Sequence, residues 1–92
     1  MSGNGVGLRQ RSLVVISGEL PGGEKIVQNL ALDHDTGVPE GNLIGQAFAY
    51  ARQAGGLMVD VPGGSVYFYP LIHFARVHFE VKRVVIQDVG LQ

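Results

Sequence analysis

"SLVVISGELPGGEKIVQNLALD", residues 12–33, contains two segments rich in β-forming residues on either side of a Pro-Gly-Gly turn. Val14 and Ile16 share one face of the first segment, while Leu13 and Val15 make its other face apolar as well. A strand with two apolar faces is typical of the centre of a sheet, where both faces are covered. The second segment alternates apolar and polar residues, which is the pattern of a half-buried strand. Because Pro sets φ for the turn and Gly supplies positive φ, we predict a β-hairpin here.

A helical pattern follows this hairpin in the segment "NLIGQAFAYARQAGG", residues 42–56. Asn42 is a suitable N-cap, and Gly55 and Gly56 form a stop signal. Several small residues would let the helix lie close to a sheet or to a twin helix. The apolar stripe expected along one side of the helix consists of Ile44, Ala47, Phe48 and Ala51.

The segment "GLMVDVPGGSVYFYP", residues 56–70, repeats the strand, Pro-Gly-Gly and strand order of the first hairpin. Pro70 cannot donate a backbone hydrogen bond, so we expect it to end a strand or to mark a bend. From Ala75 to Lys82, apolar and polar residues alternate again. The predicted fold is α+β: a small antiparallel sheet of four to five strands, in the order ββ-α-ββ-β, with one helix packed on a face.

The length and composition indicate one small domain that is rich in apolar residues. The chain has 92 residues, of which 46% are apolar, and it has no cysteine. We assign the glycine-containing residues 1–11 to a flexible N-terminal arm and residues 12–92 to the domain. A short chain builds a small core, so surplus apolar residues suggest burial against another copy or a partner. The lack of cysteine excludes disulfides and thiolate metal sites.

The charge pattern does not favour a nucleic acid or a membrane as the partner. The net charge is −1 and the seven lysines and arginines are scattered along the chain, so no global field attracts an anionic partner. No apolar run approaches the roughly 20 residues of a membrane span. The N-terminal residues also lack the apolar stretch of a signal peptide. We expect a cytoplasmic protein that does not bind membranes.

The last predicted strand has a polar face that becomes apolar toward its end. Arg76, His78, Glu80 and Lys82 share this face at successive intervals of about 6.5–7 Å. Arg76 and His78 could contact a phosphate or a carboxylate, and the alternative is a solvated face whose charges prevent edge aggregation. Val84 and Ile86 continue the same side with apolar side chains. We interpret this change either as a bulge that shifts the register or as contact with another molecule.

Further candidates for ligand binding are His34, His73 and Tyr69, which would line a pocket between the helix and the sheet. His34 lies between two aspartates, the one local pairing that suits acid–base catalysis, but no residue lies in a nucleophile motif. The histidines also lack the spacing of a known metal site. We therefore predict no catalytic residue, no metal and no cofactor, and we find no positive reason to expect an enzyme.

The leading hypothesis is a small non-enzymatic binding or structural module that forms a homo-oligomer, most simply a dimer. The C-terminal strand and the helix would supply the interface, through Val84, Ile86, Phe48 and Ala51. A first alternative is nucleic-acid binding by the arginines of the arm and by the strand face of Arg76 and Lys82, which added salt would weaken steeply. A second alternative is a small-ligand-binding protein or an enzyme that uses the pocket between helix and sheet.

Overall fold

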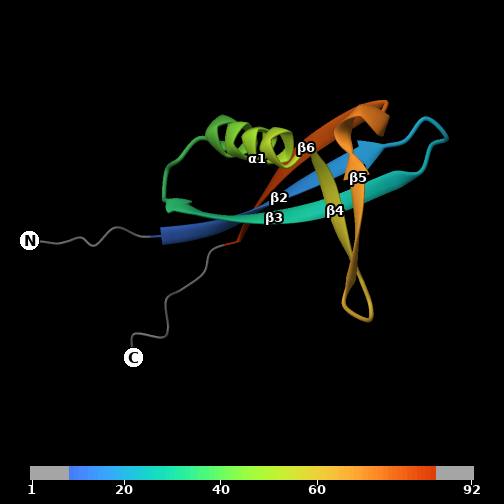
Figure 1. Ribbon diagram of the computed structural model, residues 1–92. Helices are drawn as coiled ribbons and strands as arrows, with labels where there is room; N and C mark the ends of the chain where they lie inside the picture. The colour runs from blue at the N-terminus through green and yellow to red at the C-terminus, as the bar shows by residue number, and fades with distance from the viewer. Residues whose placement is uncertain (1–8, 85–92) are drawn as a thin grey trace, which may run out of the picture.

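The computed structural model describes residues 9–84 as one α-helix, five strands and a short 3₁₀ helix (Figure 1). In chain order these elements are β2 (Arg9–Glu19), β3 (Lys25–Asp35), α1 (Glu40–Ala54), β4 (Gly56–Val61), β5 (Ser65–Pro70), the 3₁₀ helix η1 (Leu71–His73) and β6 (Arg76–Val84). The predicted α+β class is confirmed, with the order ββ-α-ββ-β, antiparallel pairing and one helix on a face.

The strands are divided between two antiparallel sheets. β2 is the central strand of a three-stranded sheet with the order β3-β2-β6, and β4 pairs with β5 in a second sheet. The central position of β2 explains why both of its faces are apolar. The β2–β3 hairpin is paired along its whole length, from Arg9 opposite Asp35 to Glu19 opposite Lys25. Pro70 and η1 lead the chain out of the second sheet, so that β6 returns to pair with β2.

The sheet begins earlier in the chain than we predicted. β2 starts at Arg9, so residues 9–11, which the sequence analysis assigned to the arm, are strand residues. Arg9 is held by an ion pair to its cross-strand neighbour Asp35, with 3.0 Å between Nη1 and Oδ1. Residues 1–8 and 85–92, which include the interface candidate Ile86, lie outside the described part of the chain.

Helix α1 also begins two residues before the predicted start. Pro39 is the N-cap, with φ −63° and ψ 148°. The predicted cap, Asn42, lies inside the helix, and its backbone N–H donates to the Pro39 carbonyl at 3.0 Å. The prediction of Asn42 as N-cap was therefore wrong, because a proline with extended ψ can precede a helix without a side-chain cap. The predicted stop is confirmed: Gly55 has φ 82°, and its N–H donates to the Ala51 carbonyl at 2.9 Å.

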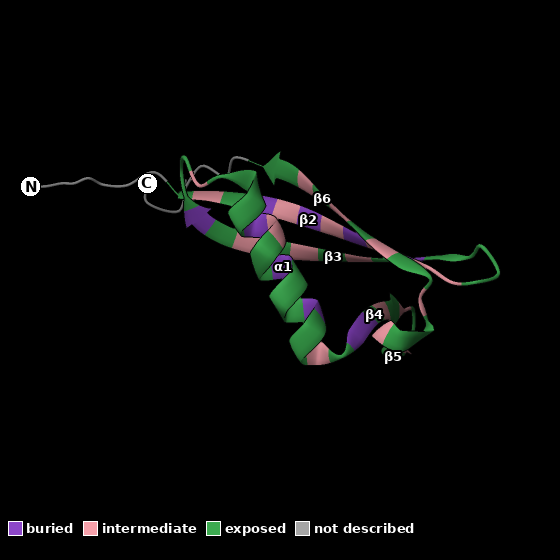
Figure 2. Ribbon diagram, turned by 90° about the horizontal axis from the view of Figure 1, so that it is seen from above, coloured by how far each residue is buried: buried purple, intermediate pink, exposed green. Residues whose placement is uncertain are grey.

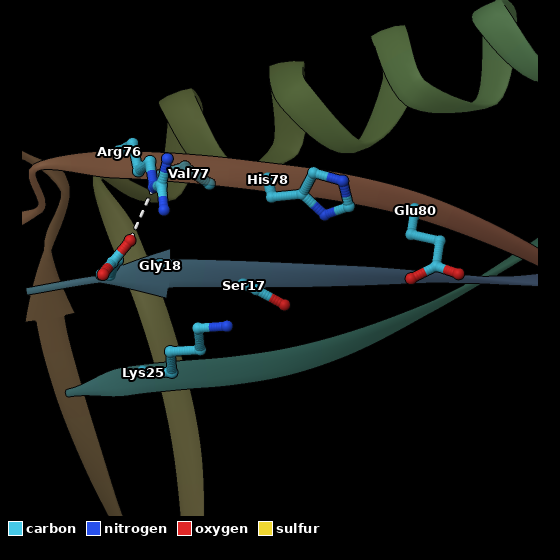
Figure 3. A pocket seen from close by; sticks show the side chains of 8 residues that line it. Ser17, Gly18, Lys25, Arg76, Val77, His78 and Glu80 are labelled. Carbon is cyan, nitrogen blue, oxygen red and sulfur yellow. Dashed lines mark hydrogen bonds and ion pairs between the residues drawn. The ribbon is translucent and has the colours of Figure 1, made fainter. Parts of the chain in front are cut away.

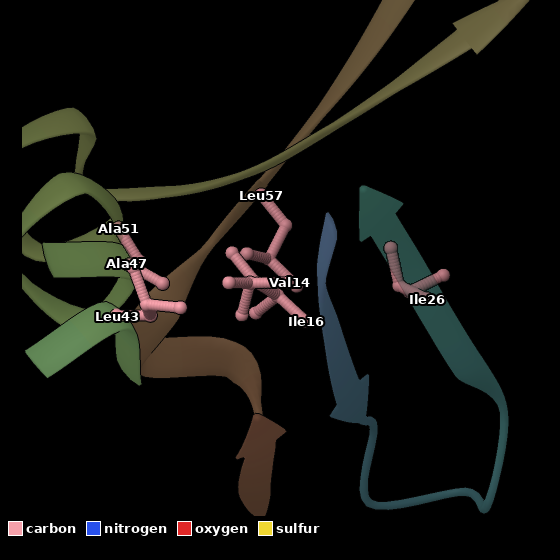
Figure 4. Packing of buried hydrophobic residues seen from close by; sticks show 7 residues of the cluster. All are labelled: Val14, Ile16, Ile26, Leu43, Ala47, Ala51 and Leu57. Carbon is pink, nitrogen blue, oxygen red and sulfur yellow. The ribbon is translucent and has the colours of Figure 1, made fainter. Parts of the chain in front are cut away.

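The core lies between α1 and one face of the three-stranded sheet, and it includes Leu57 at the start of β4 (Figure 4). Buried residues of α1 recur every fourth position and point toward Val14 and Ile16 of β2. The buried apolar residues are Val14, Ile16, Ile26, Leu43, Ala47, Ala51 and Leu57. The predicted helical stripe was therefore correct at Ala47 and Ala51, but it missed Leu43.

A glycine in β2, Gly18, permits close contact between the three-stranded sheet and the segment that follows η1. A Cβ at Gly18 would lie 2.5 Å from Cε1 of Phe74, the residue that follows η1. Phe74 in turn packs against Tyr69 of β5, with ring centroids 6.4 Å apart. Gly18 therefore lets the ring of Phe74 pack against the three-stranded sheet, next to the start of β6.

The fold is extended relative to its size. The radius of gyration is 16.0 Å, whereas a compact domain of this length would have about 12 Å. Figure 1 shows the reason: the β4–β5 hairpin projects away from the layer that α1 and the three-stranded sheet form. A fold of this shape has a small core and a large surface.

Candidate functional site

The face of the three-stranded sheet opposite α1, which we call the open face, carries a polar hollow of about 570 Å³ near the Pro-Gly-Gly turn (Figure 3). All three strands contribute to it. Its lining residues are Ser17, Gly18, Glu19, Lys25, Arg76, Val77, His78 and Glu80. Strand alternation places the polar members on the open face, because the residues that flank them in each strand face α1.

Register explains how the charged side chains come together. Glu19 of β2 lies opposite Lys25 of β3 on one side and opposite Arg76 of β6 on the other. The guanidinium of Arg76 donates from Nε to Oε1 of Glu19 at 2.6 Å. Ser17 and His78 form the next cross-strand pair. The hollow forms because the side chain of Ser17 is small and is surrounded by longer side chains.

The structure brings together two of the three predicted residues on the last strand. Arg76 and His78 both line the hollow. Lys82 is on the same face of β6, opposite Leu13 of β2, and is not among the lining residues. Lys25 and Ser17, which sequence reasoning did not select, come from the first hairpin. Only the register of three strands connects them with β6, so no local pattern marks them.

Of the other predicted ligand residues, His34 lies far from His73 and Tyr69. His34 pairs with Gln10 near the start of β2, whereas His73 lies in η1, close to the other end of β2 at Glu19. About 30 Å of strand separates Gln10 from Glu19. Tyr69 lies at the His73 end, where it contacts Phe74. The pocket that these three residues were expected to share is therefore not formed.

His34 belongs to a buried polar pair that the sequence analysis missed. Its Nε2 lies 2.7 Å from the hydroxyl of Ser12, and its Nδ1 lies 2.8 Å from the backbone carbonyl of Asp35. A carbonyl can only accept, so Nδ1 carries the proton and Ser12 donates to Nε2. A serine beside an oriented histidine could act as a nucleophile, but Ser12 is fully buried and His34 is only 6% exposed. The pair satisfies buried polar groups within the core layer.

The second notable surface is on the β4–β5 hairpin, in which the start of β4 is buried and β5 is exposed from Ser65 to Phe68 (Figure 2). Phe68 and Val66 lie on one side of β5, with Met58 opposite Phe68 on β4. Tyr67 lies on the other side and is still 61% exposed, and Ile72 in η1 is 88% exposed. We call this set of exposed apolar residues the hairpin surface; it comprises Met58, Val66, Tyr67, Phe68 and Ile72.

The predicted interface residues have different surroundings. Ala51 is buried in the core, so it packs within the chain. Phe48 is 50% exposed, and its ring makes an edge-to-face contact with Phe79 of β6 at 6.1 Å. Val84 is half-exposed and pairs with Arg11 in regular register, so no bulge precedes it within the described residues.

The arginines proposed for nucleic-acid binding are paired with carboxylates. Arg11 contacts Asp33 at 2.7 Å, and comparable pairs join Arg9 to Asp35 and Arg76 to Glu19. The hydrogen bond from Arg11 holds the pKa of Asp33 below its ordinary value, and the same bond raises the pKa of Arg11. Paired guanidiniums have less positive potential to offer to a phosphate backbone.

The described residues contain neither a metal-binding cluster nor a membrane-spanning helix. Over residues 9–84, no group of three or more His, Cys, Asp or Glu side chains is arranged to hold a metal ion. In the same part of the chain, α1 has 15 residues and no helix has the length and apolar character to cross a membrane.

Comparison with known proteins gives no relative. No family model matches the chain, and neither the curated proteins nor the solved structures yielded a match.

Proposed function

We propose that the protein is a small non-enzymatic binding module that associates with a second copy of itself through the hairpin surface. The observation that carries this proposal is the exposure of β5, in which Val66, Tyr67 and Phe68 are all about half-exposed or more. Large exposed apolar patches on a small protein mark surfaces that another molecule covers. A two-stranded hairpin is also marginally stable by itself in water, so added strands would stabilise it.

The absence of charged residues from β5 favours a second copy of the chain as the partner. β5 has the sequence "SVYFYP", without a charged residue. Antiparallel pairing of β5 with its twin across a two-fold axis would therefore oppose no like charges. β6, one of the two edge strands of the other sheet, instead alternates charged residues such as Arg76, Glu80 and Lys82, which discourage strand addition. Pairing of two β5 strands would produce a four-stranded sheet with the order β4-β5-β5-β4.

The self-association expected from the sequence is retained in this proposal, but the proposed interface is the hairpin surface instead of the helix and the C-terminal strand. The predicted interface lay on the helix and the C-terminal strand, but Ala51 is a core residue and Phe48 packs on Phe79. Val84 remains an exposed apolar residue on the open face. The hairpin surface has a larger group of such residues and an unpaired strand edge.

Sedimentation equilibrium of matched variants tests the proposal. Phe68 and Phe48 are the same residue type with nearly equal exposure, 49% and 50%. We expect wild type to dimerise, and Phe68→Glu to weaken dimerisation by about tenfold or more, because burial of a carboxylate at the interface is unfavourable. Phe48→Glu should dimerise within about twofold of wild type. A wild-type protein that stays monomeric at all concentrations would refute self-association, and a loss confined to Phe48→Glu would place the interface on the helix.

A further inference from the structure

The hollow on the open face has an excess of positive charge at one end. Lys25, Glu19 and Arg76 form one cross-strand row, with two cations and one anion. The carboxylate of Glu19 accepts from Arg76 Nε at 2.6 Å. Among the described residues, Lys25 takes part in no ion pair. The ammonium of Lys25 therefore remains available to a negatively charged ligand.

Other donors lie beside this ammonium. A guanidinium has five N–H groups in a fork that suits carboxylate and phosphate oxygens, and the described contacts of Arg76 use only Nε. The next row adds the hydroxyl of Ser17 and the imidazole of His78. In Figure 3, the side chain of Lys25 extends toward Ser17, and the side chain of Arg76 lies across the hollow from it.

The shape of the hollow leaves room for a ligand between these donors. On the central strand Ser17 contributes only a short side chain to the open face, while Lys25 and Arg76 extend from the strands on either side. Glu80 lies on β6 four residues from Arg76, which is about 13 Å along the strand. The hollow is thus rich in donors near the turn and acidic at its other end.

We propose that this hollow binds the oxyanion of a small molecule, a carboxylate or a phosphate, between Lys25 and Arg76 with Ser17 as a further donor. Charge-assisted hydrogen bonds from these groups hold the oxyanion. Glu80 disfavours a second negative charge at the far end, so the ligand carries its anionic group at one end only. This site is separate from the hairpin surface and does not depend on self-association.

The test is an amide NMR titration of the full chain with sodium acetate and, separately, with inorganic phosphate, at constant ionic strength set by chloride. We expect saturable shifts at Ser17, Gly18, Lys25 and Arg76 with at least one of the two anions, and the anion that saturates identifies the preferred oxyanion. Non-saturable shifts with both anions, or shifts spread over all basic residues, would overturn the proposal.

Two lysine variants complete the experiment. Lys25→Gln should weaken binding by about tenfold or more, since it removes a charged donor. Lys82→Gln is the matched control, because Lys82 lies on the same sheet face outside the hollow, and its affinity should stay within about twofold of wild type. Equal weakening by both substitutions would show general charge attraction and refute a site. The amide spectrum of each variant verifies that it is folded.

Discussion

The two sheets of this protein differ in what covers them and in where their charges lie. The three-stranded sheet is covered on one face by α1, and β6, one of its two edge strands, alternates charged side chains. The β4–β5 sheet has a single buried side chain of large size, Leu57, and β5 has no charge. The first sheet therefore contains most of the interactions that stabilise the chain by itself. The second sheet has the features of a surface that is completed by another molecule.

The largest expected effect is loss of the core beneath α1. Ile16→Ala should lower the free energy of unfolding by about 2–5 kcal/mol, because Ile16 is fully buried on the central strand. Val66→Ala, on the exposed side of β5, should change it little. Urea unfolding at protein concentrations below the dissociation constant of the dimer measures the stability of both variants. Equal losses of unfolding free energy in the two variants would mean that both sheets contribute alike to stability, which would contradict the contrast between them.

A smaller effect, localised to the second sheet, is expected at Gly56. A Cβ at Gly56 would overlap the carbonyl oxygen of Tyr69 and lie 2.9 Å from Cζ of Phe68. Gly56→Ala should therefore separate β4 from β5 at a cost of about 1–3 kcal/mol. Amide exchange should accelerate in β4 and β5 more than in β2.

The matched control for this substitution is Gly45→Ala on α1. No atom lies within 4 Å of a Cβ built at Gly45, so alanine should stabilise the helix by roughly 0.5–1 kcal/mol. Unchanged protection of the β4 and β5 amides in Gly56→Ala would contradict the close approach of the two strands.

The smallest effect concerns the exposed pair Arg11–Asp33 on the first sheet. The folded-state pKa of Asp33 is lowered by the hydrogen bond from Arg11, so the pair stabilises the fold above the ordinary aspartate pKa of about 3.9. That contribution is lost as pH falls through the lower folded-state pKa. Wild type should be slightly more stable than Arg11→Gln at pH 6, and the difference should close below about pH 4. If the difference between the two urea midpoints widened on acidification, the pair would not stabilise the fold through the ionised carboxylate of Asp33.

Periodicity predicted which elements exist, and register decided what they bring together. The alternation in β6 and the two apolar faces of β2 are local signals, and both were interpreted correctly. Ser12 pairs with His34, and Lys25 lies across β2 from Arg76. These residues are 22 and 51 positions apart in the chain, respectively. Those contacts follow from strand order and register, which a single sequence does not specify.

One local error, the assignment of residues 9–11 to the arm, has a physical cause as well. The arginines at the start of β2 resemble a flexible arm until their cross-strand aspartates are known. Val66, Tyr67 and Phe68 have the composition of core residues, yet the structure exposes them, because β4 and β5 form a separate hairpin. The excess of apolar residues was visible in the sequence, but its location was not.

The central claim is that β5 pairs with its own copy, and a cysteine scan along residues 65–69 tests it most directly. The chain has no cysteine, so each single-cysteine variant can form a disulfide only with the same residue of a second copy. Directly opposed residues in an antiparallel pair share a sheet face, so a two-fold axis normal to the sheet places one residue of β5 opposite itself. We expect one position in this range to form a covalent dimer rapidly under mild oxidation, and its neighbours to do so much more slowly. A protein that dimerises without a disulfide at any β5 position, while a cysteine at Val84 links readily, would contradict it.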